Sequence, residues 1–249
     1  MKSSRLQSLG MGGTAVRPLT LVLTTVLGAL LLAPSPAGAV PIPIFGSGLL
    51  GSFTGSFDYT AIDDTSGTVS VSLTNTTPPA DGGFLTAFVF NLPFPGVVTA
   101  APLTSSDTDF ATIGGPPPPP GDDFADSVNG APFGQFDIGA STGGSFEGGG
   151  MPSLGFGPGG VATFDFALTG TGLGSLTPLD FLSTLSVPPG AGQGLESFLV
   201  RFRGFAEDGS DRVAADFEAP TPIPEPGSAL LLSLGLVSLS ARQLRSRRR

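Results

Sequence analysis

The chain has 249 residues and a formal net charge of −9, and it contains neither histidine nor cysteine. Histidine-dependent catalytic triads, cysteine nucleophiles and zinc sites built from these residues are therefore excluded. Residues 40–224 hold 19 acidic side chains against three cationic ones (Arg201, Arg203 and Arg212), so nucleic acid is excluded as a partner because phosphate neutralisation needs cations.

The first 39 residues have the pattern of a secretory signal peptide. Basic residues precede an apolar stretch at 19–32, which predicts a signal helix. Ala37 and Ala39 then form a small-x-small cleavage site, which would place the mature N-terminus at Val40. We expect a Sec-type translocase to export the chain.

The predicted exported domain, residues 40–221, begins with the alternation that is typical of β-strands. Residues 52–60 and 67–74 place apolar side chains at alternate positions, and a turn sequence at 63–67 joins them. We therefore expect a hairpin. Residues 84–92 are apolar almost throughout and predict a central strand.

A stretch rich in glycine and proline follows at 114–160. It includes consecutive prolines at 116–120, which favour a stiff extended segment without internal hydrogen bonds. We expect a long loop here, with one short strand at 133–138.

Strand patterns return in the last part of the predicted domain. Residues 161–169 and 197–206 alternate, while 179–185 fits either a strand or one helical turn. The Asp-Gly pair at 208–209 is a hairpin signal, and it predicts a return strand at 212–217.

These elements indicate an all-β fold with the phenylalanines as core material. All 20 phenylalanines lie within residues 45–217. Because the alternating strands each present one apolar face, that face needs a partner layer. We expect a two-sheet sandwich, flanked by the N-terminal signal helix and a C-terminal transmembrane helix.

Clustered aspartates are the remaining candidates for chemistry in the domain. Carboxylate pairs could bind calcium or hydrolyse a glycoside, but capping of their own turns is the interpretation we favour for all of them. The clusters are Asp63/Asp64, Asp107/Asp109, Asp122/Asp123/Asp126 and Asp208/Asp211. We expect no cofactor, with calcium left open as a ligand, and we expect Arg201 and Arg203 to pair with carboxylates on the sheet surface.

The C-terminal segment, residues 222–249, has three parts in a fixed order. Pro224, Glu225 and Pro226 come first, and an apolar run at 229–239 follows. The two prolines hold the triplet extended and remove two backbone donors. The chain then ends in an arginine cluster that includes Arg247, Arg248 and Arg249. Such arginines resist translocation and hold the C-terminus on the cytoplasmic side.

This order resembles the PEP-CTERM sorting domain. In that bacterial family an exosortase, a membrane-embedded cysteine transpeptidase, recognises the tail and processes the protein. The resemblance implies that Pro224, Glu225 and Pro226 are the recognition site and that the C-terminal helix tethers the protein to the membrane. It also implies an exopolysaccharide setting.

We therefore expect a non-enzymatic bacterial surface or extracellular-matrix protein. It would be tethered to the inner membrane first, and would reach the cell envelope or the outside after processing. Two alternatives stay open for the domain: a calcium- or glycan-binding module of the same architecture, and a carboxylate glycosidase.

Overall fold

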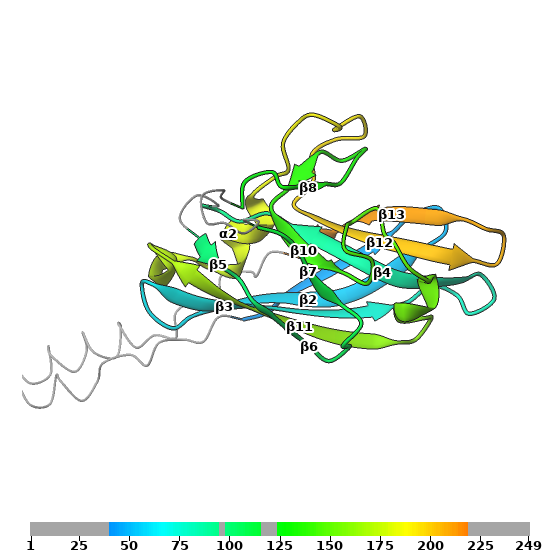
Figure 1. The fold of residues 1–249 in the computed structure, drawn as a ribbon, viewed down its shortest axis with the longest axis horizontal. Helices are drawn as coiled ribbons and strands as arrows, with labels where there is room; N and C mark the ends of the chain where they lie inside the picture. The colour runs from blue at the N-terminus through cyan, green and yellow to red at the C-terminus, as the bar shows by residue number, and fades with distance from the viewer. Residues whose placement is uncertain (1–39, 95–97, 116–123, 219–249) are drawn as a thin grey trace, which may run out of the picture. The chain divides into compact units, whose positions relative to one another are not determined.

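The computed structural model describes residues 40–94, 98–115 and 124–218, and most of their regular structure is β-strand (Figure 1). The prediction of an all-β domain is confirmed. Within these ranges, no helix combines the length and the apolar character that crossing a membrane requires. The helices predicted in 1–39 and 222–249 lie outside the described residues.

The first sheet, called sheet A here, has seven antiparallel strands. Its order is β14-β1-β2-β3-β11-β5, and β6 also pairs with β11. The strands are β1 (Ile42–Ser47), β2 (Ser52–Ala61), β3 (Ser66–Asn75), β5 (Val98–Ala100), β6 (Leu103–Ser105), β11 (Val161–Gly170) and β14 (Asp216–Phe217).

The second sheet, sheet B, has five antiparallel strands in the order β13-β12-β4-β10-β7, and a two-stranded ribbon β8-β9 stands apart from it. The strands are β4 (Gly82–Phe90), β7 (Ala111–Gly114), β8 (Val128–Asn129), β9 (Gln135–Phe136), β10 (Ile138–Ser141), β12 (Phe198–Phe205) and β13 (Ser210–Ala214). The short helices are α2 (Pro178–Ser183), η2 (Pro152–Leu154) and η3 (Leu173–Ser175).

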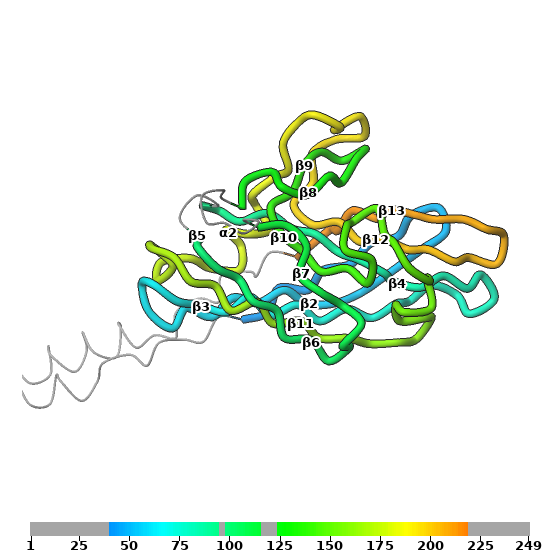
Figure 2. Tube along the Cα trace, viewed as in Figure 1, coloured from blue at the N-terminus to red at the C-terminus, as the bar shows by residue number. Residues whose placement is uncertain are grey.

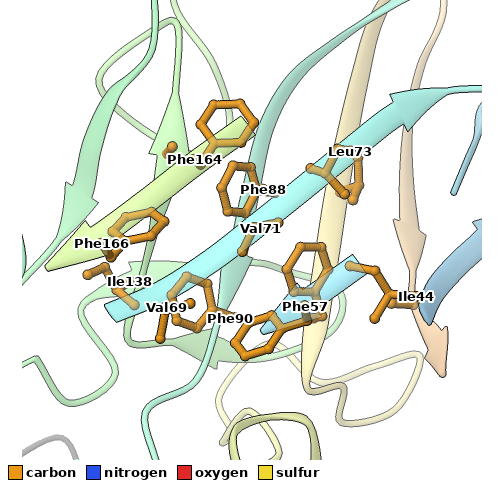
Figure 3. Close-up of a cluster of buried hydrophobic side chains, with 14 of the residues drawn as sticks. Ile44, Phe57, Val69, Val71, Leu73, Phe88, Phe90, Ile138, Phe164 and Phe166 are labelled. Carbon is orange, nitrogen blue, oxygen red and sulfur yellow. The ribbon is translucent and has the colours of Figure 1, made fainter. Parts of the chain in front are cut away.

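Phenylalanine rings from the two sheets form the main core (Figure 3). Phe88 of β4 stacks on Phe198 of β12, with ring centroids 5.6 Å apart and an interplanar angle of 12°. The ring of Phe164, from β11 of sheet A, meets Phe88 edge-on at 4.7 Å. Because all three side chains are fully buried, the two sheets face each other across this aromatic layer.

The strands predicted from alternation are confirmed. β2 and β3 form the expected hairpin, and Oδ1 of Asp63 caps its turn by accepting a hydrogen bond from the Thr65 amide at 2.7 Å. β11 alternates between exposed and buried positions along its whole length, with Phe164 and Phe166 inside. β4 is central in sheet B, as its apolar run predicted.

The stretch 114–160 is more ordered than the long loop that its composition predicts. It contributes β8, β9 and β10, and β10 pairs with both β4 and β7 inside sheet B (Figure 2). At Gly139 the neighbouring strand comes very close, since an added Cβ atom would lie 2.0 Å from the Phe88 carbonyl oxygen. Glycine therefore permits this strand, although the same glycine weakens its strand signal.

The same stretch covers the outer face of sheet B. A second apolar cluster joins Phe136 and Phe146 from this stretch to Val89 of β4 and Leu199 of β12. As a result, β12 is buried on both faces along its first half. Arg201 pairs with a carboxylate, that of Glu147, as predicted. The predicted place on the sheet surface is wrong, because this covering leaves Arg201 only 7% exposed.

The return strand predicted at 212–217 is divided between the sheets. β13 ends at Ala214 in sheet B, and β14 pairs with β1 in sheet A, where Phe217 lies opposite Ile44. The segment left open at 179–185 is helical through most of its length, as α2.

Candidate functional site

The domain gathers its three cationic side chains on the outer face of sheet B. Arg201 and Arg203 extend from β12, and Arg212 of β13 lies directly opposite Arg201 in the register. Residues 40–224 contain these three cationic side chains and 19 acidic ones. This concentration of positive charge in an acidic domain makes it the candidate site.

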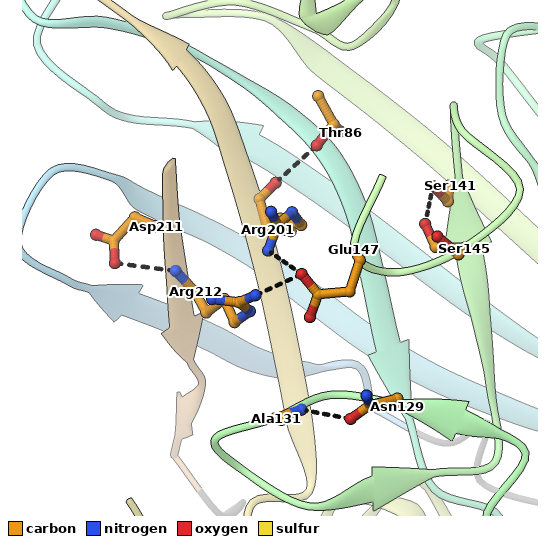
Figure 4. A network of polar contacts seen from close by, with 9 residues as sticks. All are labelled: Thr86, Asn129, Ala131, Ser141, Ser145, Glu147, Arg201, Asp211 and Arg212. Atoms are coloured by element: carbon orange, nitrogen blue, oxygen red, sulfur yellow. Dashed lines mark hydrogen bonds and ion pairs between the residues drawn. The ribbon is translucent and has the colours of Figure 1, made fainter. Parts of the chain in front are cut away.

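Glu147 binds two of these arginines through a single oxygen atom (Figure 4). Its Oε2 lies 3.2 Å from Nη1 of Arg201 and 2.5 Å from Nη2 of Arg212. Glu147 belongs to the glycine-rich strap, our name for residues 142–150. A further contact holds the strap, because Nη1 of Arg203 donates to the Gly149 carbonyl at 3.2 Å.

The arginines present more donors than this arrangement satisfies. Nε of Arg201 and Nε of Arg212 are buried and have no hydrogen-bond acceptor among the described residues, and Nη1 of Arg201 has its ion pair with Glu147 but no hydrogen bond of good geometry. A buried donor without an acceptor is costly, and more so when it carries charge.

The charges around Arg201 also show that the cluster has too little negative charge to balance its arginines. Burial lowers the pKa of the Arg201 guanidinium, and the charge of Arg212 lowers it further, whereas Glu147 opposes both effects. Arg201 remains protonated under these influences, because the pKa of a guanidinium is far above neutrality. The cluster therefore holds two cations against one carboxylate, and that carboxylate is partly open to solvent.

A groove of about 480 Å³ runs along β13 and reaches the cluster at Arg212. Residues of the β1–β2 turn, of the segment after β8 and of the segment before β12 form the rest of its lining, with Leu49, Phe133, Gln193 and Glu196 among them. Burial raises the pKa of the Glu196 carboxyl, and the nearby charge of Asp216 raises it further.

Asp211 also lines the groove, but its carboxylate is committed to the fold. Its Oδ2 accepts hydrogen bonds from the amides of Leu50 and Gly51 at 2.8 and 3.1 Å, and its Oδ1 accepts one from the Arg212 amide. The side chain therefore connects β13 to the β1–β2 turn through hydrogen bonds.

In two of the other aspartate clusters, Asp63 and Asp107 cap their own turns, and Asp122 and Asp123 lie outside the described residues. Asp63 accepts from Thr65 and Ser66, and these hydrogen bonds, led by the one from the Thr65 amide, lower the pKa of its carboxyl. Asp107 accepts from the Asp109 amide at 3.1 Å. In the part of the chain that the structure describes, no three His, Cys, Asp or Glu side chains gather closely enough to hold a metal ion.

The sorting and cleavage residues predicted from the sequence lie outside the described residues. They are Ala37, Ala39, Pro224, Glu225, Pro226, Arg247, Arg248 and Arg249. The prediction that Arg203 pairs with a carboxylate is wrong, since Nη1 of Arg203 donates to the Gly149 carbonyl instead. Sequence reasoning missed Glu147 altogether, although it is the single acidic residue in the strap.

No protein-family model matches the chain, and no curated protein matches it either.

Proposed function

We propose that the chain is an exported bacterial surface or extracellular-matrix protein that an exosortase sorts and processes through its C-terminal segment. The observation that carries this proposal is the order of Pro224-Glu225-Pro226, the apolar run and the terminal arginines. A signal-peptide pattern at the other end of the chain supports it independently.

The fold of the domain is compatible with such a tail. The last described strand, β14, ends at Phe217, and the triplet begins at Pro224. The few residues between them would form a linker that presents the triplet to a membrane enzyme, and its two prolines favour an extended backbone there. In this proposal the domain is cargo without catalytic activity, tethered to the inner membrane until processing releases it to the envelope or the exopolysaccharide outside.

Intact-mass analysis of the protein recovered from cells with and without an exosortase tests the proposal. With the enzyme, we expect a species that lacks residues 1–39 and the arginine tail. Without it, the tail should remain. A product of identical mass in both strains would contradict the sorting function.

Two variants distinguish recognition of the Pro-Glu-Pro triplet by the exosortase from a general effect of changing the linker sequence. Glu225→Ala with Pro226→Ala should leave the tail uncleaved in the strain that contains the enzyme. Pro222→Ala removes a proline just before the triplet and should be processed as the wild type is. Equal processing of both variants would show that the triplet is not the recognised element.

A further inference from the structure

We propose that Arg201 and Arg212 form a binding site for an oxyanion group of a ligand, a carboxylate, sulfate or phosphate, and that Glu147 takes the place of that group in the unliganded protein. The ligand would enter from the groove along β13. This inference is independent of how the protein is sorted.

The two arginines offer more hydrogen-bond donors than Glu147 can accept. A guanidinium carries about five N–H donors in a planar fork that matches two oxygen atoms of one anion. Here both forks converge on Oε2 of Glu147, and the Nε atoms of both arginines are buried without an acceptor among the described residues. An anion with several oxygens would satisfy donors that a single shared oxygen does not.

The cluster also carries an excess of positive charge. Arg201 and Arg212 face each other across β12 and β13, a position where like charges repel. The charge of Arg203 adds to the same field and lowers the pKa of Arg201 a little further. One carboxylate leaves this cluster with an excess of positive charge, which the binding of an anion would reduce. Glu196, Asp211 and Asp216 also line the groove, and the carboxylate of Asp211 already accepts hydrogen bonds from three backbone amides. Carboxylates farther than about 8 Å from the arginines are weakened by salt screening.

Solvent reaches the cluster from the groove. Arg212 is among the residues that line the groove, and its side chain is 27% exposed. The groove volume of about 480 Å³ lies in the range of small-ligand sites. Glu147 is 43% exposed, so it is the part of the cluster that solvent reaches most easily. It can therefore leave the arginines without unfolding a strand.

The strap that carries Glu147 is open at Gly144 and closely packed where Gly143 lies against Gly149. It contains five glycines, and nothing lies within 4 Å of the position where Gly144 would carry a Cβ atom. Phe146 anchors the middle of the strap in the apolar cluster. We therefore expect the Glu147 side chain and its glycine neighbours to move while Phe146 stays in place.

The wild-type protein provides the direct test. The full chain, labelled with a nitrogen isotope, would be titrated with sodium sulfate, phosphate or acetate, against sodium chloride at matched ionic strength. We expect saturable shifts of arginine Nε–Hε signals with at least one oxyanion and not with chloride. Shifts that chloride reproduces, or no shifts with any of the three, would overturn the site.

Variants test the role of Glu147 as the internal competitor. Glu147→Gln removes the competing charge, so we expect about threefold to tenfold tighter binding of the oxyanion that the wild type prefers. Arg212→Met removes one fork and should weaken binding by about tenfold or more. The matched control is Glu207→Gln, which changes the net charge equally in the exposed turn before β13 and should leave the affinity unchanged.

The variants also have outcomes that contradict the proposal. If Glu147→Gln weakened binding, or if Glu207→Gln tightened it equally, Glu147 would not occupy the ligand's place. Thermal melting of each variant shows whether it is folded at the temperature of the titration. The wild-type titration decides the existence of the site even if Arg212→Met does not fold.

Discussion

The side-chain amide of Asn75 donates a hydrogen bond to the carbonyl oxygen of Phe156 at 3.1 Å and so ties the end of β3 to the segment that precedes β11. The same amide donates to the Gly83 carbonyl at 3.0 Å, while Oδ1 accepts from the Thr77 amide. Asn75 is completely buried. One side chain thus connects the start of β4, the end of β3 and the entry to β11.

Replacement of Asn75 by alanine should destabilise the domain by about 2–3 kcal/mol, because two buried carbonyls and one buried amide lose a partner. Urea unfolding of the two proteins measures the difference. Asn129→Ala is the matched control, since exposed Asn129 accepts only local hydrogen bonds from Ala131 and Gln135 and should cost less than about 1 kcal/mol. Equal losses in both variants would contradict a special role for Asn75.

Phe88→Ala should destabilise the domain by about 3–5 kcal/mol, because the cavity lies where β4, β12 and β11 meet. Phe88 has ring contacts with Phe164, Phe166 and Phe198. Chemical denaturation gives the free energy of unfolding. Phe94→Ala is the control, as Phe94 is 56% exposed and its loss should change stability by less than about 0.5 kcal/mol.

Periodicity was sufficient to predict β2, β3 and β11 because each of these strands has one face on the core and one toward solvent. The sequence then alternates as the burial does, and a turn such as that capped by Asp63 marks the end. The sandwich follows from the same pattern, since alternating phenylalanines require a second layer.

The elements that sequence reasoning missed depend on contacts between distant segments. β10 is short and contains Gly139, so its strand character comes from lying between β4 and β7. Arg201 looked like a surface residue because the alternation of β12 does not reveal that Phe146 and its neighbours cover the outer face. Its contact with Glu147 depends on the same covering, so no local spacing could have indicated the site.

Glu147 and Arg201 should show strong energetic coupling. Glu147→Gln leaves two neighbouring arginines without their carboxylate, so we expect a loss of about 1–3 kcal/mol in the free energy of unfolding. Arg201→Met exchanges a poorly satisfied buried cation for an apolar side chain and should cost about 1 kcal/mol or less. In the double variant the penalty of Glu147→Gln should shrink, because one of the two unpaired cations is gone.

A double-mutant cycle, measured by urea unfolding, gives this coupling. Glu207→Gln, in the turn between β12 and β13, is the charge-matched control and should leave stability nearly unchanged. Strictly additive losses in the cycle would contradict a shared role of Glu147 and Arg201.

Glu196 should make the domain less stable as the pH rises. Burial, and then the charge of Asp216, raise the pKa of its carboxyl in the folded protein. The folded state therefore holds the proton more tightly than the unfolded chain does. This contribution to stability is complete below the pKa that the carboxyl has in the unfolded chain, and it is lost as the pH rises through the higher folded pKa.

Glu196→Gln removes this loss because its amide is neutral at every pH. The melting temperature of the variant should therefore exceed that of the wild type at about pH 7, and the difference should vanish near pH 4. Glu207→Gln provides the comparison, since exposed Glu207 lies in a turn at the other end of β13 from Asp216. The difference in melting temperature between Glu196→Gln and the wild type could instead stay constant with pH or grow on acidification. Either result would show that ionisation of Glu196 does not destabilise the folded domain.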